Sequence, residues 1–114
     1  MHEASIAQDI IDIVNDVMTG YPDKKVKQVN VIIGEMVAVV PESLQFSYQA
    51  ISAESPLQDS ILNIEIVPIL ARCRSCDKEF DISAFEFYCP FCQSLSIEIL
   101  KGNEFYIKDV EISE

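Results

Sequence analysis

The chain has 114 residues, 49% of them hydrophobic, and a formal net charge of −11 from 19 acidic and 8 basic side chains. This length suits one modest globular domain, or a small domain that carries a smaller metal-bound module. The negative charge would repel nucleic acid, so we expect no nucleic-acid binding. No run of about 20 apolar residues and no secretory signal is visible, so we expect a cytoplasmic protein with no membrane association, in which disulfides rarely persist.

The first segment predicts an amphipathic helix. Ser5-Ile6-Ala7-Gln8 has the form of a capping box, which satisfies free backbone donors at a helix start. Apolar residues then recur at helical spacing until Gly20 and Pro22 end the pattern. We expect residues 1–4 to form a short tail before this helix. The side chains on its predicted buried face are Ile6, Ile10, Ile13, Val14, Val17 and Met18.

A strand and a second helix are predicted next. Val26–Ile33 is rich in β-branched residues, and Val29, Val31 and Ile33 would share one face. Pro41 suits the first position of a helix, and Glu42 in its first turn complements the helix dipole. Ser55-Pro56 would end it. The predicted buried residues of this helix are Leu44, Phe46, Tyr48 and Ile51.

Three further segments have strand-like patterns. Ser60–Pro68 alternates, with Leu62, Ile64 and Ile66 on one face. Ser96–Leu100 and Glu104–Ile112 are the others, and a change of parity in the last indicates a bulge near residues 108–109.

These elements predict an α+β fold in which two helices pack on a small β-sheet and a zinc-ribbon-like module is inserted. On this interpretation residues 1–68 and 101–114 form one α+β domain, and residues 69–100 form the inserted zinc-binding module.

Two cysteine pairs provide the most specific motif in the chain. Cys73 and Cys76 form one C-x-x-C pair, and Cys89 and Cys92 form a second after twelve intervening residues. Each tight turn can direct two sulfurs to one point, so two such turns make a tetrahedral tetrathiolate, the geometry of structural zinc. Because the protein fills all four positions, no position is left for a catalytic water.

Other interpretations of the cysteines are weaker. Disulfides are unusual in the expected compartment, and a thioredoxin-type site needs one C-x-x-C pair at a helix start. An iron site with four thiolates stays open, because spacing does not separate iron from zinc. Arg72 and Arg74 flank the first pair, and we expect them to neutralise part of the thiolate charge.

The opening Met1-His2-Glu3 contains the only histidine of the chain. The amine of Met1, the backbone nitrogen of His2 and its Nδ1 can together chelate one metal ion through a five-membered and a six-membered ring. Such nitrogen donors suit Ni²⁺ and Cu²⁺, and copper is favoured by intrinsic affinity. Glu3 or a donor from another protein could complete the site. The alternative is that His2 lies on an idle terminal tail.

The whole chain resembles the HypA/HybF family of nickel-incorporation proteins for [NiFe] hydrogenase maturation. The residues that carry the resemblance are Met1-His2-Glu3, Ile33-Gly34-Glu35, Val40–Phe46, the IEIVP strand and the two cysteine pairs. The resemblance implies a non-enzymatic metallochaperone with nickel bound by Met1, His2 and Glu3. It also implies structural zinc bound by Cys73, Cys76, Cys89 and Cys92.

The same resemblance implies two partners, a HypB-type GTPase and the hydrogenase large-subunit precursor, and it leaves a homodimer open. Asp77 and Gln93 follow the two cysteine pairs at positions where the family often has glycine, so we expect differences in the turns there.

Two other classes of function are less well supported. A zinc-ribbon adaptor with no nickel role is the main alternative. An enzyme is disfavoured, because no nucleophile–histidine pair or phosphate loop is present, and Glu35 and Glu42 are better explained as exposed acids. Aromatic residues near the second cysteine pair would form either the small core of the module or a partner surface: Phe85, Phe87, Tyr88 and Phe91.

Overall fold

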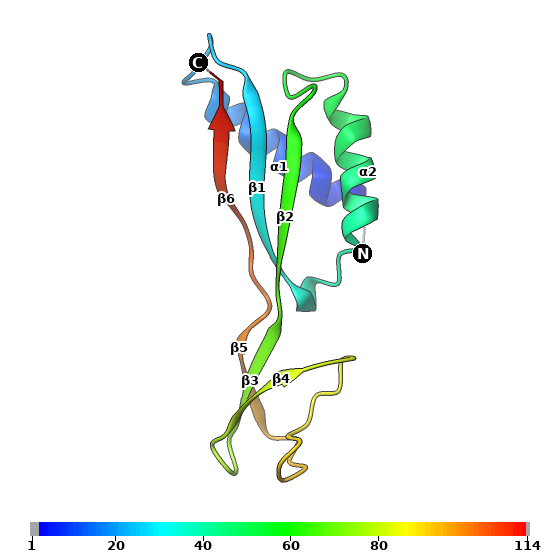
Figure 1. Ribbon diagram of the computed structural model, residues 1–114, viewed down its shortest axis with the longest axis vertical. Coiled ribbons are helices and arrows are strands. Elements are labelled where there is room, and N and C mark those ends of the chain that lie inside the picture. Colours follow the sequence, from blue (N-terminus) through cyan, green and yellow to red (C-terminus); the bar gives the residue numbers. More distant parts are fainter. Residues whose placement is uncertain (1–2, 114) are drawn as a thin grey trace. The chain divides into compact units, whose positions relative to one another are not determined.

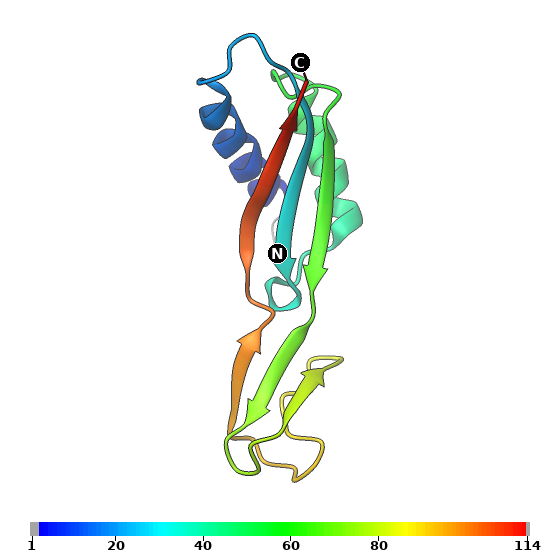
Figure 2. The same ribbon diagram turned by 60° about the vertical axis from the view of Figure 1, so that its left-hand side comes forward.

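Figures 1 and 2 show the computed structural model, which describes residues 3–113. These residues form two compact units. Unit 1 contains the residues up to Ile32, Val39–Glu65, and the residues from Tyr106 onward; unit 2 contains Ile33–Ala38 and Ile66–Phe105. Two helices and two three-stranded sheets among the described residues confirm the expected α+β class. The metal roles expected for residues 1–68 with 101–114 and for residues 69–100 stay predictions.

Unit 1 is built on helices α1 and α2 and a sheet with the strand order β2-β1-β6. Strands β1 and β2 run in the same direction and are joined through α2, whereas β6 runs in the opposite direction (Figures 1 and 2). Both helices cover one face of this sheet (Figure 2). The elements are α1 (Glu3–Met18), β1 (Val26–Gly34), α2 (Pro41–Ser52), β2 (Ile61–Val67) and β6 (Phe105–Ile112).

The core of unit 1 consists almost entirely of aliphatic side chains. Tyr48 is its largest fully buried residue, and its hydroxyl lies 2.6 Å from the Ser60 hydroxyl, so the polar end of the ring has a partner. Burial raises the pKa of Tyr48, which keeps the phenol neutral. The fully or nearly buried aliphatic residues include Ile10, Ile11, Val14, Val29, Val31, Leu44, Leu57 and Leu62.

Two details of the α1 prediction are wrong. The helix begins at Glu3, so Glu3 and Ala4 belong to it and not to the expected tail of residues 1–4. Ser5 therefore lies inside the first turn, and the Gln8 amide donates to the Asp12 carboxylate 2.8 Å away, within the helix. Ile13 and Val17, expected in the core, are 53% and 49% exposed. The buried face is centred one position to the side, on Ile6, Ala7, Ile10, Ile11 and Val14. The apolar pattern of α1 is wider than the face that its neighbours cover, and sequence alone did not show which part stays exposed.

Helix α2 starts at Pro41 as predicted, and its buried positions are spaced by four residues. Leu44, Tyr48 and Ser52 form this buried stripe, while Ile51 is half-buried. The prediction for Phe46 is wrong, because its side chain is 74% exposed. Phe46 lies two positions from Leu44 in the helix, which places it on the opposite side.

Unit 2 contains an antiparallel sheet with the strand order β4-β3-β5. In this sheet Ala71 of β3 lies opposite Phe80 of β4 and Ile99 of β5. The strands are β3 (Ile69–Cys73), β4 (Glu79–Ile82) and β5 (Ile97–Lys101). The buried cluster is small and contains two cysteines; its members are Ile69, Ala71, Cys73, Phe80, Ile82 and Cys89.

A close backbone crossing fixes residues 33–38 within unit 2. The Gly34 N–H donates to the Glu104 carbonyl, and the Met36 N–H, in the short helix η1 (Glu35–Val37), donates to the Gly102 carbonyl, both at 2.7 Å. A Cβ atom on Gly34 would lie 2.0 Å from the Gly102 oxygen. Only glycine fits at this position, because the backbones pass too closely for any side chain.

The other strand predictions hold within a residue or two. Ser60–Pro68 contains β2, Ser96–Leu100 overlaps β5, and Glu104–Ile112 contains β6. The bulge near residues 108–109 stays a prediction. Among the described residues, no helix has the length and apolar character that crossing a bilayer requires.

Candidate metal centre

The first cysteine pair lies in a tight turn directly after β3. Cys73 is the last residue of that strand, and its carbonyl accepts the Asp77 N–H at 2.9 Å. The Cys73 N–H donates to the Lys78 carbonyl, also at 2.9 Å, so the turn is closed from both sides. Asp77 has φ of 64°, in the left-handed region that glycine adopts most easily.

The second pair repeats this geometry. The Cys89 carbonyl accepts the Gln93 N–H at 2.8 Å, and the Cys89 N–H donates to the Ser94 carbonyl at 2.9 Å. Gln93 has φ of 68°, matching Asp77 in the first turn. The expected difference at these two positions is therefore conformational: non-glycine residues occupy a backbone conformation that costs them free energy.

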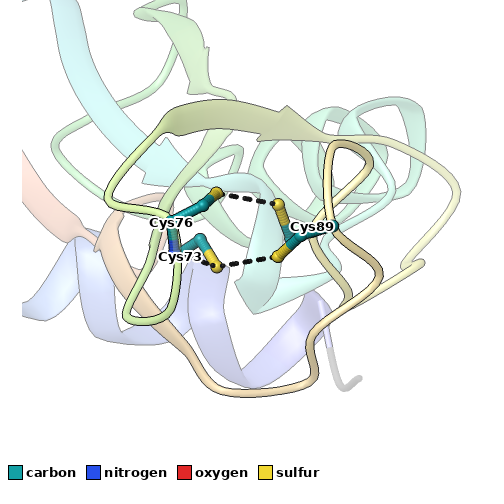
Figure 3. A group of neighbouring side chains, drawn as sticks. Cys73, Cys76 and Cys89 are labelled. Atoms are coloured by element: carbon teal, nitrogen blue, oxygen red, sulfur yellow. Dashed lines mark hydrogen bonds between the residues drawn. The ribbon is translucent and has the colours of Figure 1, made fainter.

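The four sulfur atoms meet at one point. The Sγ atoms of Cys73 and Cys92 are 3.5 Å apart, those of Cys76 and Cys89 are 3.6 Å apart, and all four lie within 4.8 Å of one another. Figure 3 shows Cys73 and Cys76 facing the second turn, which carries Cys89. Zinc with four thiolates at its usual bond length requires sulfurs about 3.8 Å apart, so this cluster fits such an ion. All four cysteines are free thiols.

Backbone donors point at the sulfurs and favour their ionised form. The N–H groups of Cys76 and Ser75 lie 3.4 and 3.3 Å from the Cys73 sulfur, and they lower the pKa of that thiol to about 6, against the effect of burial. The Phe91 N–H lies 3.4 Å from the Cys89 sulfur in the same way. A site that stabilises negative sulfur at this spacing suits a cation bound by thiolates.

Cys92 shows why a cation belongs among these sulfurs. The Ser94 backbone donor acts to lower the pKa of the Cys92 thiol, but the neighbouring Cys73 sulfur, burial and the other two thiols outweigh it, and the pKa is raised to about 12. Four thiols this close cannot all ionise without a positive charge between them. A divalent metal ion supplies that charge.

Contacts outside the sulfurs hold the two turns together. The hydroxyls of Ser75 and Ser94, one from each turn, lie 3.1 Å apart. The Arg74 N–H donates to the Ser96 carbonyl at 2.9 Å, which joins the first turn to the segment before β5. The centre is thus shaped by the polypeptide as well as by its sulfurs.

The two arginines beside the first pair bind other groups. The Arg72 guanidinium donates to the Glu98 carboxylate at 2.6 Å, with Asp77 3.8 Å away, and the Arg74 guanidinium donates to the Ile97 carbonyl at 2.6 Å. Their charge is directed to β5, which differs from the expected neutralisation of the thiolates.

Most of the aromatic residues near the second pair lie on the surface. Phe85, Phe87 and Phe91 are 54%, 36% and 59% exposed, and Tyr88 is half-buried. The Lys78 ammonium lies 4.7 Å from the centre of the Phe91 ring. Of the two interpretations of this cluster, the small core of the module is wrong for the three phenylalanines.

The predicted nickel ligands are only partly within the described residues. Met1 and His2 lie outside them. Glu3 begins α1, and its carboxylate accepts the Val40 N–H at 3.2 Å, just before Pro41 opens α2. The start of one helix is thereby joined to the start of the other, where the helix dipole favours a carboxylate. No sequence motif indicated this contact.

Glu35 and Glu42, which the sequence analysis weighed as a carboxylate pair, lie at the surface. Both are exposed, Glu35 belongs to unit 2, and Glu42 lies in the first turn of α2 in unit 1. They are surface acids, as the sequence analysis favoured.

The sequence and the structure were compared with known proteins. The family model described as "HypA: Hydrogenase/urease nickel incorporation, metallochaperone, hypA" matches residues 1–112. The hydrogenase maturation factors HypA of Desulfatibacillum aliphaticivorans and Desulfosudis oleivorans are each 36% identical over the whole chain, which covers 88% and 100% of their lengths.

Solved structures agree with these matches. The solution structure of the nickel metallochaperone HypA from Helicobacter pylori is 26% identical, with a TM-score of 0.66 over 98% of this chain and 97% of that one. A second solution structure of a HypA protein gives a TM-score of 0.69 at 26% identity, over 99% and 97% of the two chains. With its two helices, its four-cysteine metal centre and a family match from the first residue, the chain belongs to the HypA family of nickel metallochaperones for hydrogenase maturation, a non-enzymatic family.

Proposed function

We propose that this chain binds Ni(II) through the Met1 amine, the His2 backbone nitrogen, His2 Nδ1 and a donor from Glu3. The observation that carries the proposal is the family match, which begins at residue 1 and so includes the Met1-His2-Glu3 motif. These donors close two chelate rings, and nitrogen ligands suit Ni²⁺. The ion is cargo, bound and then released.

The contact of Glu3 supports this location. Its carboxylate accepts the Val40 N–H, so one residue of the proposed site is held between the starts of α1 and α2. Because Glu3 is held in place, less conformational entropy is lost when the preceding residues chelate the ion. The ion would stay accessible to a receiving protein. Transfer by ligand exchange requires such access.

The four cysteines, in this proposal, hold structural zinc. The sulfur spacing and backbone donors suit a tetrahedral thiolate site in which the protein occupies every position. In this role zinc stabilises the fold of unit 2 and takes no part in carrying nickel. Delivery to the hydrogenase large-subunit precursor, in the cytoplasm and together with a HypB-type GTPase, completes the proposed role.

Calorimetric titration with Ni²⁺ tests the chelate. Protein that starts at Met1 should bind one ion, and both His2→Ala and a form with one glycine added before Met1 should lose that site. Zinc content, measured by mass spectrometry, should be equal in all three proteins, which shows that unit 2 is intact. If the extended form binds nickel as tightly as the original, the amine is not a ligand and the chelate is wrong.

A matched pair of acid variants defines the role of Glu3. Glu3→Gln keeps an oxygen that can accept the Val40 N–H but removes the charge, and Glu42→Gln removes a charge from the exposed first turn of α2. If the Glu3 carboxylate is a ligand, only Glu3→Gln weakens nickel binding. Equal affinity of both variants would assign the remaining donor to another group.

A zinc-ribbon adaptor without nickel is the second candidate. The exposed aromatic side chains of Phe85 and Phe91 favour a protein contact on unit 2. That function predicts that His2→Ala leaves every binding event unchanged, so the nickel titration separates the two candidates.

A further inference from the structure

An apolar groove runs between α1 and strand β6 in unit 1. It has a volume of about 400 Å³ and lies on the part of α1 that sequence analysis had assigned to the core. Ile13, Val17 and Tyr21 on its α1 side are about half exposed. The lining residues from β6 are Ile107, Asp109, Val110 and Ile112. Exposed apolar side chains gathered in one groove are typical of a binding surface.

Strand β6 forms an edge beside this groove with which no other described strand pairs. It is an outer strand of the sheet, because the order is β2-β1-β6. Its eight residues, Phe105–Ile112, contain no proline, which would remove a backbone donor; the charges on the strand are Lys108, Asp109 and Glu111. A segment that paired with β6 would therefore find a long edge with alternate backbone groups directed outward.

The charges around the groove are mainly negative. Asp9 and Asp16 lie on the exposed side of α1, three or four positions from Ile13, so they border the same surface. On β6, the carboxylates of Asp109 and Glu111 accept from the Asn30 amide of β1 at 2.5 and 3.0 Å, on the sheet face opposite to that of the buried Val29 and Val31. A basic occupant would be attracted here and an acidic one repelled.

A second copy of this chain would meet like charges in several registers along this edge. When a strand pairs with its own copy about a two-fold axis, the central residue faces itself. Centring on Lys108 or Asp109 would oppose like charges, and centring on Val110 would place Asp109 opposite Glu111. The acids on α1 would add further repulsion.

We propose that the α1–β6 groove binds an extended basic segment of a partner protein, which pairs with β6 as a fourth strand and inserts alternate apolar side chains beside Ile13 and Val17. Basic residues at the intervening positions would point to the other face of the sheet, where the carboxylates of Asp109 and Glu111 lie. Alternation is required, because successive side chains of a strand point to opposite faces.

A synthetic peptide of alternating lysine and valine tests this proposal, with a peptide of the same composition in two blocks as its control. The full-length, zinc-loaded protein labelled with ¹⁵N is titrated with each. We expect saturable binding of the alternating peptide, amide shifts concentrated in β6 and the exposed side of α1, and binding at least about tenfold weaker for the block peptide. Higher salt should weaken binding.

Two surface variants locate the site. Val17→Lys adds a positive charge and removes an apolar contact in the groove, whereas Phe46→Lys adds the same charge on the exposed side of α2. Both positions are solvent-accessible, so both variants should melt like the parent. Val17→Lys should reduce the affinity for the alternating peptide about tenfold more than Phe46→Lys does.

Several results would overturn the proposal. They are no saturable binding, equal affinity for the two peptides, amide shifts that lie outside β6, or an equal loss of peptide affinity in Val17→Lys and Phe46→Lys. Shifts in β6 that depend on protein concentration alone would instead assign the edge to self-association. The experiment contains no nickel, so its outcome is independent of the chelate.

Discussion

Unit 1 buries aliphatic side chains contributed by two helices and a sheet, whereas unit 2 has six buried residues in its cluster, two of which are cysteines. Apolar burial contributes about 25 cal/mol per Å², so a cluster as small as that of unit 2 gains little from it. A structural zinc site of this type contributes roughly 10–16 kcal/mol of apparent binding free energy. The comparison teaches that the four cysteines converge in the unit with the smaller hydrophobic core, where a bound metal ion would stabilise the fold most.

Metal removal should have the largest effect, and it should unfold unit 2 while unit 1 stays folded. We expect a strong chelator, or Cys73→Ser, to abolish the ordered amide signals of unit 2, because about 10 kcal/mol or more of binding free energy is lost. The signals of α1 and α2 should persist, since the core of unit 1 contains no cysteine. NMR spectra before and after chelation check this; simultaneous loss of both sets of signals would contradict the comparison.

Gly34→Ala should destabilise unit 2 next most strongly. The new Cβ would lie 2.0 Å from the Gly102 oxygen, so the backbone must move and the bonds from Gly34 and Met36 would break. We expect a loss of about 4 kcal/mol in the free energy of unfolding. Gly20→Ala is the matched control, because its Cβ would meet only the Val17 oxygen at 3.7 Å. Urea unfolding of the zinc-loaded proteins measures both; equal stability of the two variants would mean that the crossing is not tight.

Leu44→Ala should weaken unit 1 by about 3 kcal/mol. Leu44 is fully buried, so its truncation leaves a cavity in the core of unit 1. Zinc affinity should not change, because no cysteine lies in this core. Urea unfolding followed by helix circular dichroism measures the stability, and competition with a chromophoric chelator measures zinc binding. A tenfold fall in zinc affinity would show that the units are energetically coupled.

Glycine at the left-handed position of the second cysteine turn should give the smallest effect, and it should stabilise. Gln93 has φ of 68°, so Gln93→Gly should relieve strain and raise the stability of the zinc-loaded protein by about 0.5–1 kcal/mol. Asp77→Gly should be nearly neutral, because aspartate tolerates this conformation better and its weak pairing with Arg72 is lost. Thermal melts measure both variants; destabilisation by Gln93→Gly would show that the glutamine side chain has a role.

Much of the fold and of the metal centre was predictable, because the signals are local. The C-x-x-C spacing alone indicated that Cys73, Cys76, Cys89 and Cys92 converge, and the structure brings all four sulfurs within 4.8 Å. Pro41 marked the first residue of α2, and β-branched runs marked β1 and β2. Each of these features depends on a turn, a ring constraint or a pattern shorter than ten residues.

Features that depend on distant parts of the chain were not predictable. Ile13 and Val17 fit a buried helix face as well as Ile10 and Ile11 do, and only the packing of α1 left them at the surface. The β3–β4 pairing depends on where the first cysteine turn directs the chain.

The sequence by itself determined the two cysteine pairs that converge, most of the elements and the α+β class, because neighbouring residues carry that information. Only the tertiary structure decided that Gly34 crosses Gly102, that Glu3 meets Val40, and that α1 and β6 leave an apolar groove. The physical reason is that burial and close approach are properties of pairs of surfaces, and a single segment of sequence describes only one of the two.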